Sequence, residues 1–422
     1  MKPIQIFIAE NIPQKKVIWY TLQLIAINKR VEVIATESLQ CDLQIDQEFP
    51  LCLPFYQLLD KMDFSAIRKL AGEDICFYDA KGRPDELASI FYLSNCLQEY
   101  NYPDHDHYGR FPLEASYQFK SATLRTNIVQ QLIDQFCTKY PAFSYLKDHV
   151  RKSTVFLSHD IDFLYKAKNE DGAYALKSGK WLSIPKLLWN HYAGTPDWMN
   201  MEDILKLENS RGFHSTFFWL VQKDQLNADY EILDPNVNKL LRSVEAKRGY
   251  NGLHKSIGNK KFKEELQKFP LSCIGNRYHF LKCTIPSAWK DVQESGLHLD
   301  SSLGFASDYG FRNSYGLPFA PFDLEQQKPF SFIEVPLMLM DRTLFNSRKP
   351  LKIIKNEIFD WLDKNLENCV FAINFHNNFF SELTYAGYRQ FYTEMLEYFR
   401  HHQIQSADPN ALIAEFGFTK GF

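Results

Sequence analysis

The stretch TVFLSHDID, residues 154–162, decides the fold of the larger part of this chain. Its first half, TVFLS, is typical of a buried strand, and the strand ends at two carboxylates, Asp160 and Asp162. Carboxylates two residues apart at a strand end project towards the same face. Close like charges raise the proton affinity of one carboxylate unless a cation lies between them, so the pair indicates a divalent metal ion, with one aspartate as ligand and the other as general base. The alternative is that one or both aspartates cap the segment that follows.

Short apolar stretches of this kind recur along the rest of the chain, with helical patterns between most of them. The expected strands are 154–158, 215–221, 249–254, 277–283, 297–300, 332–337 and 369–375. The expected helices are 201–210, 235–247, 260–269, 287–295 and 351–365. Strands that alternate with helices favour parallel pairing and closure, so an α/β fold with a (β/α)7 barrel is predicted for residues 151–422. The chemistry of such barrels collects at the carboxyl ends of the strands.

Other polar side chains stand close to the expected strands and could join the aspartates. His254 ends the third strand and could bind a metal ion, and His376 follows the last strand and could protonate a leaving amine. Arg277 could hold an aspartate through a bidentate pair, although Arg277 and His279 lie near the start of their expected strand. Each has an ordinary structural alternative, as a core histidine or a surface cation. Independent structural roles would not be expected to fall at equivalent positions of one barrel, so the residues together favour one site.

The first 150 residues are predicted to form a small α/β domain of unknown role. Its expected elements are strands 4–9 and 30–36 and helices 15–27, 84–100 and about 124–138. A polar turn at 101–111 contains the run Asp104-His105-Asp106-His107, which could be taken for a metal cluster. Adjacent residues do not converge on one ion in most backbones, so a loop that tethers this domain to the barrel is the preferred interpretation.

The composition is that of a soluble globular protein, with 45% hydrophobic and 23% charged residues in 422 and a net charge of −3. This balance gives no electrostatic reason to expect nucleic acid or an anionic membrane surface as a partner. The aromatic content of 15% fits a phenylalanine-rich core or, alternatively, platforms for sugar rings. The eight cysteines form no CxxC pair, so neither a zinc finger nor a disulfide scaffold is expected. Neither a signal peptide nor a transmembrane segment is recognised, and a cytoplasmic location is therefore the expectation.

Motifs along residues 153–422 resemble, in the same order, those of the polysaccharide deacetylase superfamily (NodB homology, carbohydrate esterase family 4). SHDID at 158–162 resembles its paired-aspartate motif, and GLHKS at 252–256 resembles the motif that opens with a metal-binding histidine. The further matches are GFHSTFFWL (212–220), NRYHFLK (276–282), GLHLDSSLGF (296–305), FRNSYGLPF (311–319) and INFHNNF (373–379). The amino-terminal part resembles the uncharacterised domain that precedes a bacterial subgroup of these proteins, on IFIAENIPQKKVIWYTL, ELASIFYLSNCLQEY and HDHYGRFPLEASYQF.

The resemblance implies a deformed (β/α) barrel that carries a metal-dependent N-deacetylase, a hydrolase of a non-peptide C–N bond. Zinc is the divalent metal expected, and a carbohydrate is the expected substrate. Asp160 would be the base, with Asp162 and His254 as metal ligands. Arg277 would orient Asp160, and His376 would be the general acid.

The chain departs from the family at Gly258, where the metal-binding motif normally has its second histidine. Catalytic zinc sites usually have three protein ligands, so one is missing. His279 is the preferred substitute, with Asn259 and Ser256 as alternatives. Arg312 is a further candidate for binding an anionic group or orienting a carboxylate, and a structural ion pair is its alternative.

Three functions are compatible with these residues. The first is removal of an acetyl group from an amino sugar of a polysaccharide or its precursor. The second is a catalytically inactive barrel that binds glycan or a biosynthetic partner, which would follow if no third ligand reaches the metal. The third is hydrolysis of a C–N bond outside sugars, because barrels host many chemistries.

Overall fold

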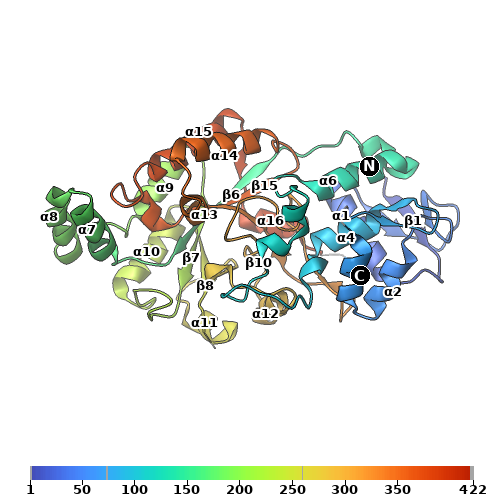
Figure 1. The fold of residues 1–422 in the computed structure, drawn as a ribbon, viewed down its shortest axis with the longest axis horizontal. Coiled ribbons are helices and arrows are strands. Elements are labelled where there is room, and N and C mark those ends of the chain that lie inside the picture. Colours follow the sequence, from blue (N-terminus) through green and yellow to red (C-terminus); the bar gives the residue numbers. More distant parts are fainter. Residues whose placement is uncertain (1, 73–74, 259, 419–422) are drawn as a thin grey trace.

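A curled, all-parallel sheet is the centre of the fold in a computed structural model of the chain, which describes residues 2–72, 75–258 and 260–418 (Figure 1). The sheet order is β13-β10-β9-β8-β7-β6-β15-β14, and the short β16 pairs with the start of β6. Its strands are β6 (Thr154–Ile161), β7 (Ser215–Leu220), β8 (Tyr250–Lys255), β9 (Asn276–Tyr278), β10 (Leu299–Asp300), β13 (Ile333–Glu334), β14 (Leu337–Met340), β15 (Val370–Asn374) and β16 (Gln405–Ser406). Only Val335 and Pro336 separate the two edge strands β13 and β14 in the sequence, so the chain itself joins the edges. This arrangement is consistent with the predicted (β/α) barrel.

Helices cover the outside of this sheet, as the alternating pattern predicted. They are α9 (Met201–Asn209), α10 (Pro235–Ala246), α11 (Phe262–Lys268), α12 (Ser287–Ser295), α13 (Asp341–Asn346), α14 (Leu351–Asp363), α15 (Tyr388–His401) and α16 (Pro409–Phe416). In α14 the buried residues Ile354, Ile358, Trp361 and Leu362 recur at helical spacing, which fixes the face that packs on the sheet. The helix pair α7 (Ala167–Lys177) and α8 (Ile184–Tyr192), between β6 and β7, was not predicted.

The expected strand 277–283 is wrong in its length. β9 ends at Tyr278 and a 3₁₀ turn, η5 (His279–Leu281), follows, with positive φ of 56° at Phe280 and 52° at Leu281. The sequence pattern of a strand continues to residue 283, but the backbone leaves the strand direction at Phe280 and Leu281. Consequently, Arg277 and His279 lie at the carboxyl end of their strand and not near its start.

The first 150 residues carry a second, three-stranded parallel sheet of order β2-β1-β3. Their elements are β1 (Ile4–Ile8), α1 (Lys15–Lys29), β2 (Val33–Ala35), β3 (Leu43–Ile45), α2 (Leu53–Asp60), α3 (Phe64–Ala71), β4 (Phe77–Tyr78), β5 (Pro84–Asp85), α4 (Glu86–Ser94), η1 (Leu97–Glu99), η2 (Leu113–Ala115), α5 (Tyr117–Lys120), α6 (Ile128–Lys139) and η3 (Pro141–Leu146). Apolar side chains from this part and from the barrel belong to one hydrophobic cluster. The division of the chain into domains at residue 150 stays a prediction.

A buried ion pair joins the amino-terminal part to the barrel. Arg312 donates from Nε and Nη2 to the two carboxylate oxygens of Glu99, at 3.0 and 2.6 Å, and both side chains are 1% exposed. Its Nη1 also donates to the carbonyl of Gly304 at 2.9 Å. Charges buried to this degree are tolerated only when they are paired and hydrogen-bonded, so this contact holds the two parts in register.

Among the described residues, none of the helices has both the length and the apolar character needed to cross a lipid bilayer.

Replacing Arg312 with Met should lower the free energy of unfolding by about 3–5 kcal/mol, because the Glu99 carboxylate is then buried without its partner. Urea denaturation followed by circular dichroism would measure the change. The exposed pair Lys81–Glu48 provides the control, since Lys81→Ala should leave the urea midpoint nearly unchanged. Equal effects of the two substitutions would contradict this account of the Arg312–Glu99 contact.

Candidate functional site

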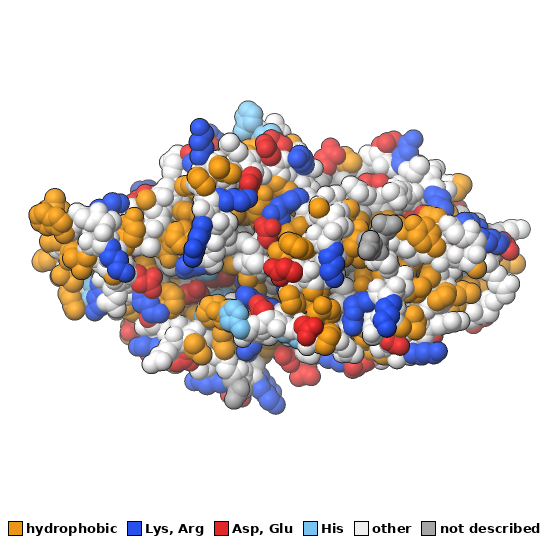
Figure 2. Space-filling model, viewed as in Figure 1, with side chains coloured by type: hydrophobic (Ala, Val, Ile, Leu, Met, Phe, Trp, Pro, Cys, Tyr) orange, Lys and Arg blue, Asp and Glu red, His pale blue; other side chains and the backbone are white. Residues whose placement is uncertain are grey.

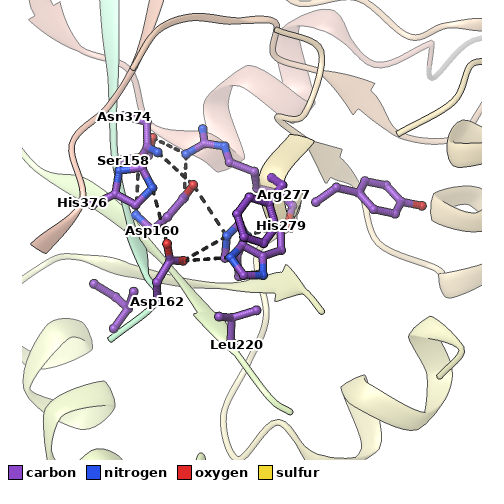
Figure 3. A network of polar contacts seen from close by, with 12 residues as sticks. Ser158, Asp160, Asp162, Leu220, Arg277, His279, Asn374 and His376 are labelled. Atoms are coloured by element: carbon purple, nitrogen blue, oxygen red, sulfur yellow. Dashed lines mark hydrogen bonds and ion pairs between the residues drawn. The ribbon is translucent and has the colours of Figure 1, made fainter. Parts of the chain in front are cut away.

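A cleft of roughly 440 Å³ opens where the central strands end, and five of the seven predicted site residues line it, all except Arg277 and Arg312. Its floor carries two carboxylates and three imidazoles, those of Asp160, Asp162, His254, His279 and His376. They come from the ends of β6, β8, β9 and β15, which the parallel sheet brings to one rim (Figure 3).

Asp160 is a buried carboxylate held by two donors. Arg277 Nη1 donates to its Oδ1 at 2.9 Å, and Asn374 Nδ2 donates to its Oδ2 at 2.8 Å. Burial alone would raise the pKa of Asp160, but the Arg277 guanidinium and the nearby imidazoles lower it below its usual value. Asp160 is therefore ionised and fixed in orientation.

Arg277 is fully buried, and every contact it makes serves to place it beside Asp160. It also donates to Ser158 Oγ at 2.8 Å, to Ser301 O at 2.8 Å and to Ser301 Oγ at 2.9 Å. Its guanidinium lies over the ring of Phe218, 4.6 Å from the centroid. Arg277 thus pairs with an aspartate, as predicted, but through one hydrogen bond and not through the bidentate contact that was expected, because its Nε and Nη2 donate to Ser301.

Asp162 faces two imidazoles without receiving a hydrogen bond from them. Its Oδ1 lies 3.4 Å from His254 Nε2 and 3.6 Å from His279 Nε2. This oxygen is buried and has no hydrogen-bond donor among the described residues. A buried carboxylate oxygen without a donor is costly, and a cation shared with the two imidazole nitrogens would remove that cost.

The tautomers of the two histidines favour metal binding. His254 Nδ1 lies 2.8 Å from the carbonyl oxygen of Arg277, an acceptor, so the proton sits on Nδ1 and the lone pair of Nε2 faces the cleft. His279 Nδ1 lies 3.3 Å from Asn227 Oδ1, which fixes its ring in the same manner. Burial lowers the pKa of His279 to about 4, so that imidazole is neutral near pH 7.

Asp162, His254 and His279 therefore form a possible metal-binding triad, whose ligand atoms all lie within 4.8 Å of one another. Two imidazole nitrogens and one carboxylate are the donor set of many catalytic zinc sites. The residues fit a divalent cation, and the structure leaves its identity open.

His376 is backed by a carboxylate that the sequence interpretation missed. Its Nδ1 lies 2.7 Å from Asp341 Oδ1, and its backbone N–H donates to Asp341 Oδ2 at 2.6 Å. Burial would lower the pKa of His376, but Asp341 and the other aspartates of the cleft raise it to about 9. His376 Nε2 lies 3.7 Å from Asp162 Oδ2 and so points into the cleft.

The backbone at residue 258 has a conformation that suits the glycine found there and would strain a histidine. Gly258 has a φ of 136°, a conformation that residues with a Cβ rarely adopt. Of the two alternatives to His279, Ser256 uses its hydroxyl to accept a hydrogen bond from Gln222 N at 3.3 Å, and Asn259 lies outside the described residues.

Arg312 and residues 104–107 do not belong to the cluster of aspartates and histidines in the cleft. Arg312 is in the buried pair with Glu99, which matches the structural ion pair named as its alternative. Asp106 accepts a hydrogen bond from Arg110 Nε at 2.7 Å and is engaged within its own loop. The loop nevertheless reaches the cleft, because Arg110 Nη1 donates to Phe280 O at 2.9 Å and the Tyr108 ring stacks on the Phe280 ring with centroids 5.2 Å apart.

Three residues of the site were not recognised from the sequence: Asn227, Asp341 and Asn374. Asn374 ends β15, so the strand-end rule that identified Asp160 would also have found it. Asp341 directly follows β14 (Leu337–Met340), but the strand expected there was 332–337, so the rule did not reach it. Asn227 lies in a loop and carries no comparable signal.

Comparisons with known proteins give a family match only for the amino-terminal part. Residues 14–144 match a family of unknown function (DUF7033). No curated protein matches the chain.

Solved structures with some likeness to this fold include two deacetylases. The crystal structure of a putative polysaccharide deacetylase from Mycobacterium smegmatis covers 61% of this chain and 93% of its own, at 13% identity and a TM-score of 0.36. The peptidoglycan deacetylase PdaC from Bacillus subtilis covers 63% and 91%, at 11% identity and a TM-score of 0.29. The 4-alpha-glucanotransferase from Thermococcus litoralis covers 63% of this chain and 40% of its own, at 12% identity and a TM-score of 0.38. Function must therefore be argued from the side chains of the cleft.

Metal analysis should find about one zinc ion per chain in protein purified with zinc, because three ligands suffice for a catalytic site. Asp162→Ala, His254→Ala and His279→Ala should each lose most of that metal, measured by plasma mass spectrometry after gel filtration. The exposed His298 provides the control, and His298→Ala should keep its metal. Equal metal in all four variants would contradict the triad.

Proposed function

We propose that this protein is a metal-dependent hydrolase that removes an acetyl group from an acetylated amino sugar of a polysaccharide or its precursor. The observation that carries the proposal is the Asp162 Oδ1 atom, which is buried between two imidazole nitrogens with no donor in the described part of the chain. A second, separately held carboxylate lies next to it. Two aspartates two residues apart are thus in different environments, which is how neighbouring carboxylates acquire different roles.

Asp162, His254 and His279 would hold the divalent ion. When bound, such an ion supplies Lewis acidity, which polarises an acyl carbonyl and lowers the pKa of water. The Arg277 carbonyl and Asn227 would keep the two imidazoles in the orientation that ligation needs.

Asp160 would act as the general base. It is ionised, and the donors Arg277 and Asn374 prevent it from turning away from the cleft. Its Oδ2 lies 3.8 Å from His254 Nε2, at the edge of the triad, where an attacking water would have to be deprotonated.

His376 would act as the general acid. The Asp341 carboxylate holds Nδ1 and raises the pKa of the ring to about 9, so the imidazole carries a second proton on Nε2 at neutral pH. Nε2 faces the cleft. The amine of an amide must be protonated as it departs, whereas a good leaving group departs without a proton.

An aromatic wall supports a sugar as substrate. Tyr108, Tyr278 and Phe280 line the cleft beside the polar cluster, and aromatic faces are suitable surfaces for the apolar sides of sugar rings. The resemblance of the motif series to polysaccharide deacetylases supports the same substrate class. An inactive barrel would be expected if nothing replaced the histidine absent at Gly258, and the position of His279 in the triad favours the hydrolase.

Asp160→Asn should lower kcat for release of amine from N-acetylglucosamine oligomers by about 10²–10⁴-fold, because the base is lost. Its zinc content should stay that of the wild type, since Asp160 is not in the triad. Asp203→Asn, at an exposed position, is the control. Wild-type turnover in Asp160→Asn would show that Asp160 is not the base.

His376→Gln should reduce turnover of the amide substrate by at least about 10²-fold and leave hydrolysis of 4-nitrophenyl acetate much less affected. The nitrophenolate leaves without a proton, so the comparison isolates the acid step from binding and water activation. A proportional loss on both substrates would argue against His376 as the general acid.

A further inference from the structure

The helix pair α7–α8 projects from one end of the molecule and carries an unusual number of exposed apolar side chains (Figures 1 and 2). Of the 20 large apolar residues that are exposed in the described part of the chain, seven lie within residues 174–192. The most exposed of them, at 62–76%, are Leu176, Trp181, Leu182, Trp189 and Tyr192. Scattered apolar residues on a surface need no explanation, but a gathered set marks a contact surface.

The apolar residues of α8 face outward in an ordered way. Pro185, Leu188, Trp189 and Tyr192 are exposed and have the spacing i, i+3, i+4 and i+7 of one helix face. Trp181 and Leu182, in the turn before α8, extend this face. Leu187 is the one buried residue of α8, and the helix packs inward through this small apolar side.

The α7–α8 hairpin, residues 166–192, is also anchored firmly at its base. Asp171 of α7 is 1% exposed and accepts hydrogen bonds from Trp198 Nε1 at 3.0 Å, Ser381 Oγ at 2.9 Å and Thr384 Oγ1 at 2.5 Å. Trp198 is itself fully buried. The hairpin that carries the outward apolar face is therefore tied to the barrel. It lies close in sequence to Asp162.

The charge of the hairpin is opposite to that of the whole chain. Residues 166–192 contain five lysines and two acidic residues, one of which is the buried Asp171, whereas the chain has a net charge of −3. None of these lysines lies in an ion pair with a described carboxylate: Lys166, Lys168, Lys177, Lys180 and Lys186. Lys168 and Lys180 instead lie over the rings of Tyr192 and Tyr174.

We propose that the α7–α8 hairpin is a membrane-interface anchor that binds anionic phospholipid. Tryptophan and tyrosine prefer the boundary between headgroups and acyl chains, and a helix with such an apolar face flanked by lysines lies in the plane of that boundary. These lysines, which form no ion pair with a carboxylate in the described part of the chain, match a negative surface and would repel a second copy of the same hairpin. Charge therefore favours lipid over self-association. The net charge of the chain gave no reason to expect this partner, because it averages over a locally basic element. The proposal is independent of the proposed hydrolysis.

Sedimentation of the full-length protein with vesicles tests the proposal. Wild type should bind vesicles of phosphatidylcholine mixed with phosphatidylglycerol far more strongly than vesicles of phosphatidylcholine alone, and high salt should weaken the binding. The variant Trp181→Ser/Leu182→Ser/Trp189→Ser should lose at least tenfold in partitioning, an order-of-magnitude expectation for three interfacial anchors. Replacing Lys177, Lys180 and Lys186 with Gln should reduce partitioning by about two orders of magnitude, at roughly fivefold per lysine.

A matched control uses exposed leucines outside the hairpin. Leu39→Ser/Leu226→Ser/Leu233→Ser removes side chains that are 62–64% exposed and should bind vesicles like the wild type. Circular dichroism would show that all three triple variants are folded. Absence of wild-type binding to anionic vesicles, or equal binding by the hairpin variant, overturns the proposal. Self-association of the wild type that the hairpin variant abolishes, without vesicle binding, would assign the surface to a second copy and also overturns it.

Discussion

The buried guanidinium of Arg277 is the contact on which the geometry of the cleft depends. It donates to Asp160 and Ser158 on β6 and to Ser301 after β10, and so ties two separate segments to β9. A charge at this depth is stable only because each of the three guanidinium nitrogens finds an acceptor nearby. With Asp160 engaged in this way, Asp162 is left as the carboxylate whose Oδ1 has no donor among the described residues.

The parallel sheet imposes the second constraint, since strand ends that are far apart in the sequence share one rim. This is why the cluster of aspartates and histidines could be predicted from 154–162, 249–254 and 369–375 without knowledge of any contact. The argument fails where a strand end is misplaced. Phe280 and Leu281 turn the backbone with positive φ although neither is a glycine, and the apolar run around them carries no turn signal.

Pairings between distant side chains could not be derived from one sequence. Arg312 and Glu99 are 213 residues apart, and either side chain alone is compatible with a surface or a site. The partner of His376, Asp341, was missed for the same reason, and because the strand before it was expected to end at residue 337 and not at Met340. The helices α7 and α8 escaped prediction because their apolar residues do not mark a core face; the larger ones point to solvent.

The contact of the 101–111 loop with Phe280 makes the amino-terminal part a wall of the cleft. Tyr108 and Arg110 stand opposite side chains of the barrel, yet neither touches the carboxylate–histidine cluster in any recorded hydrogen bond or ion pair among the described residues. Part of the opening is therefore encoded in a stretch of the chain separate from the reactive groups. Evolution could retune which molecules enter by altering one short surface loop, while leaving the reactive machinery intact.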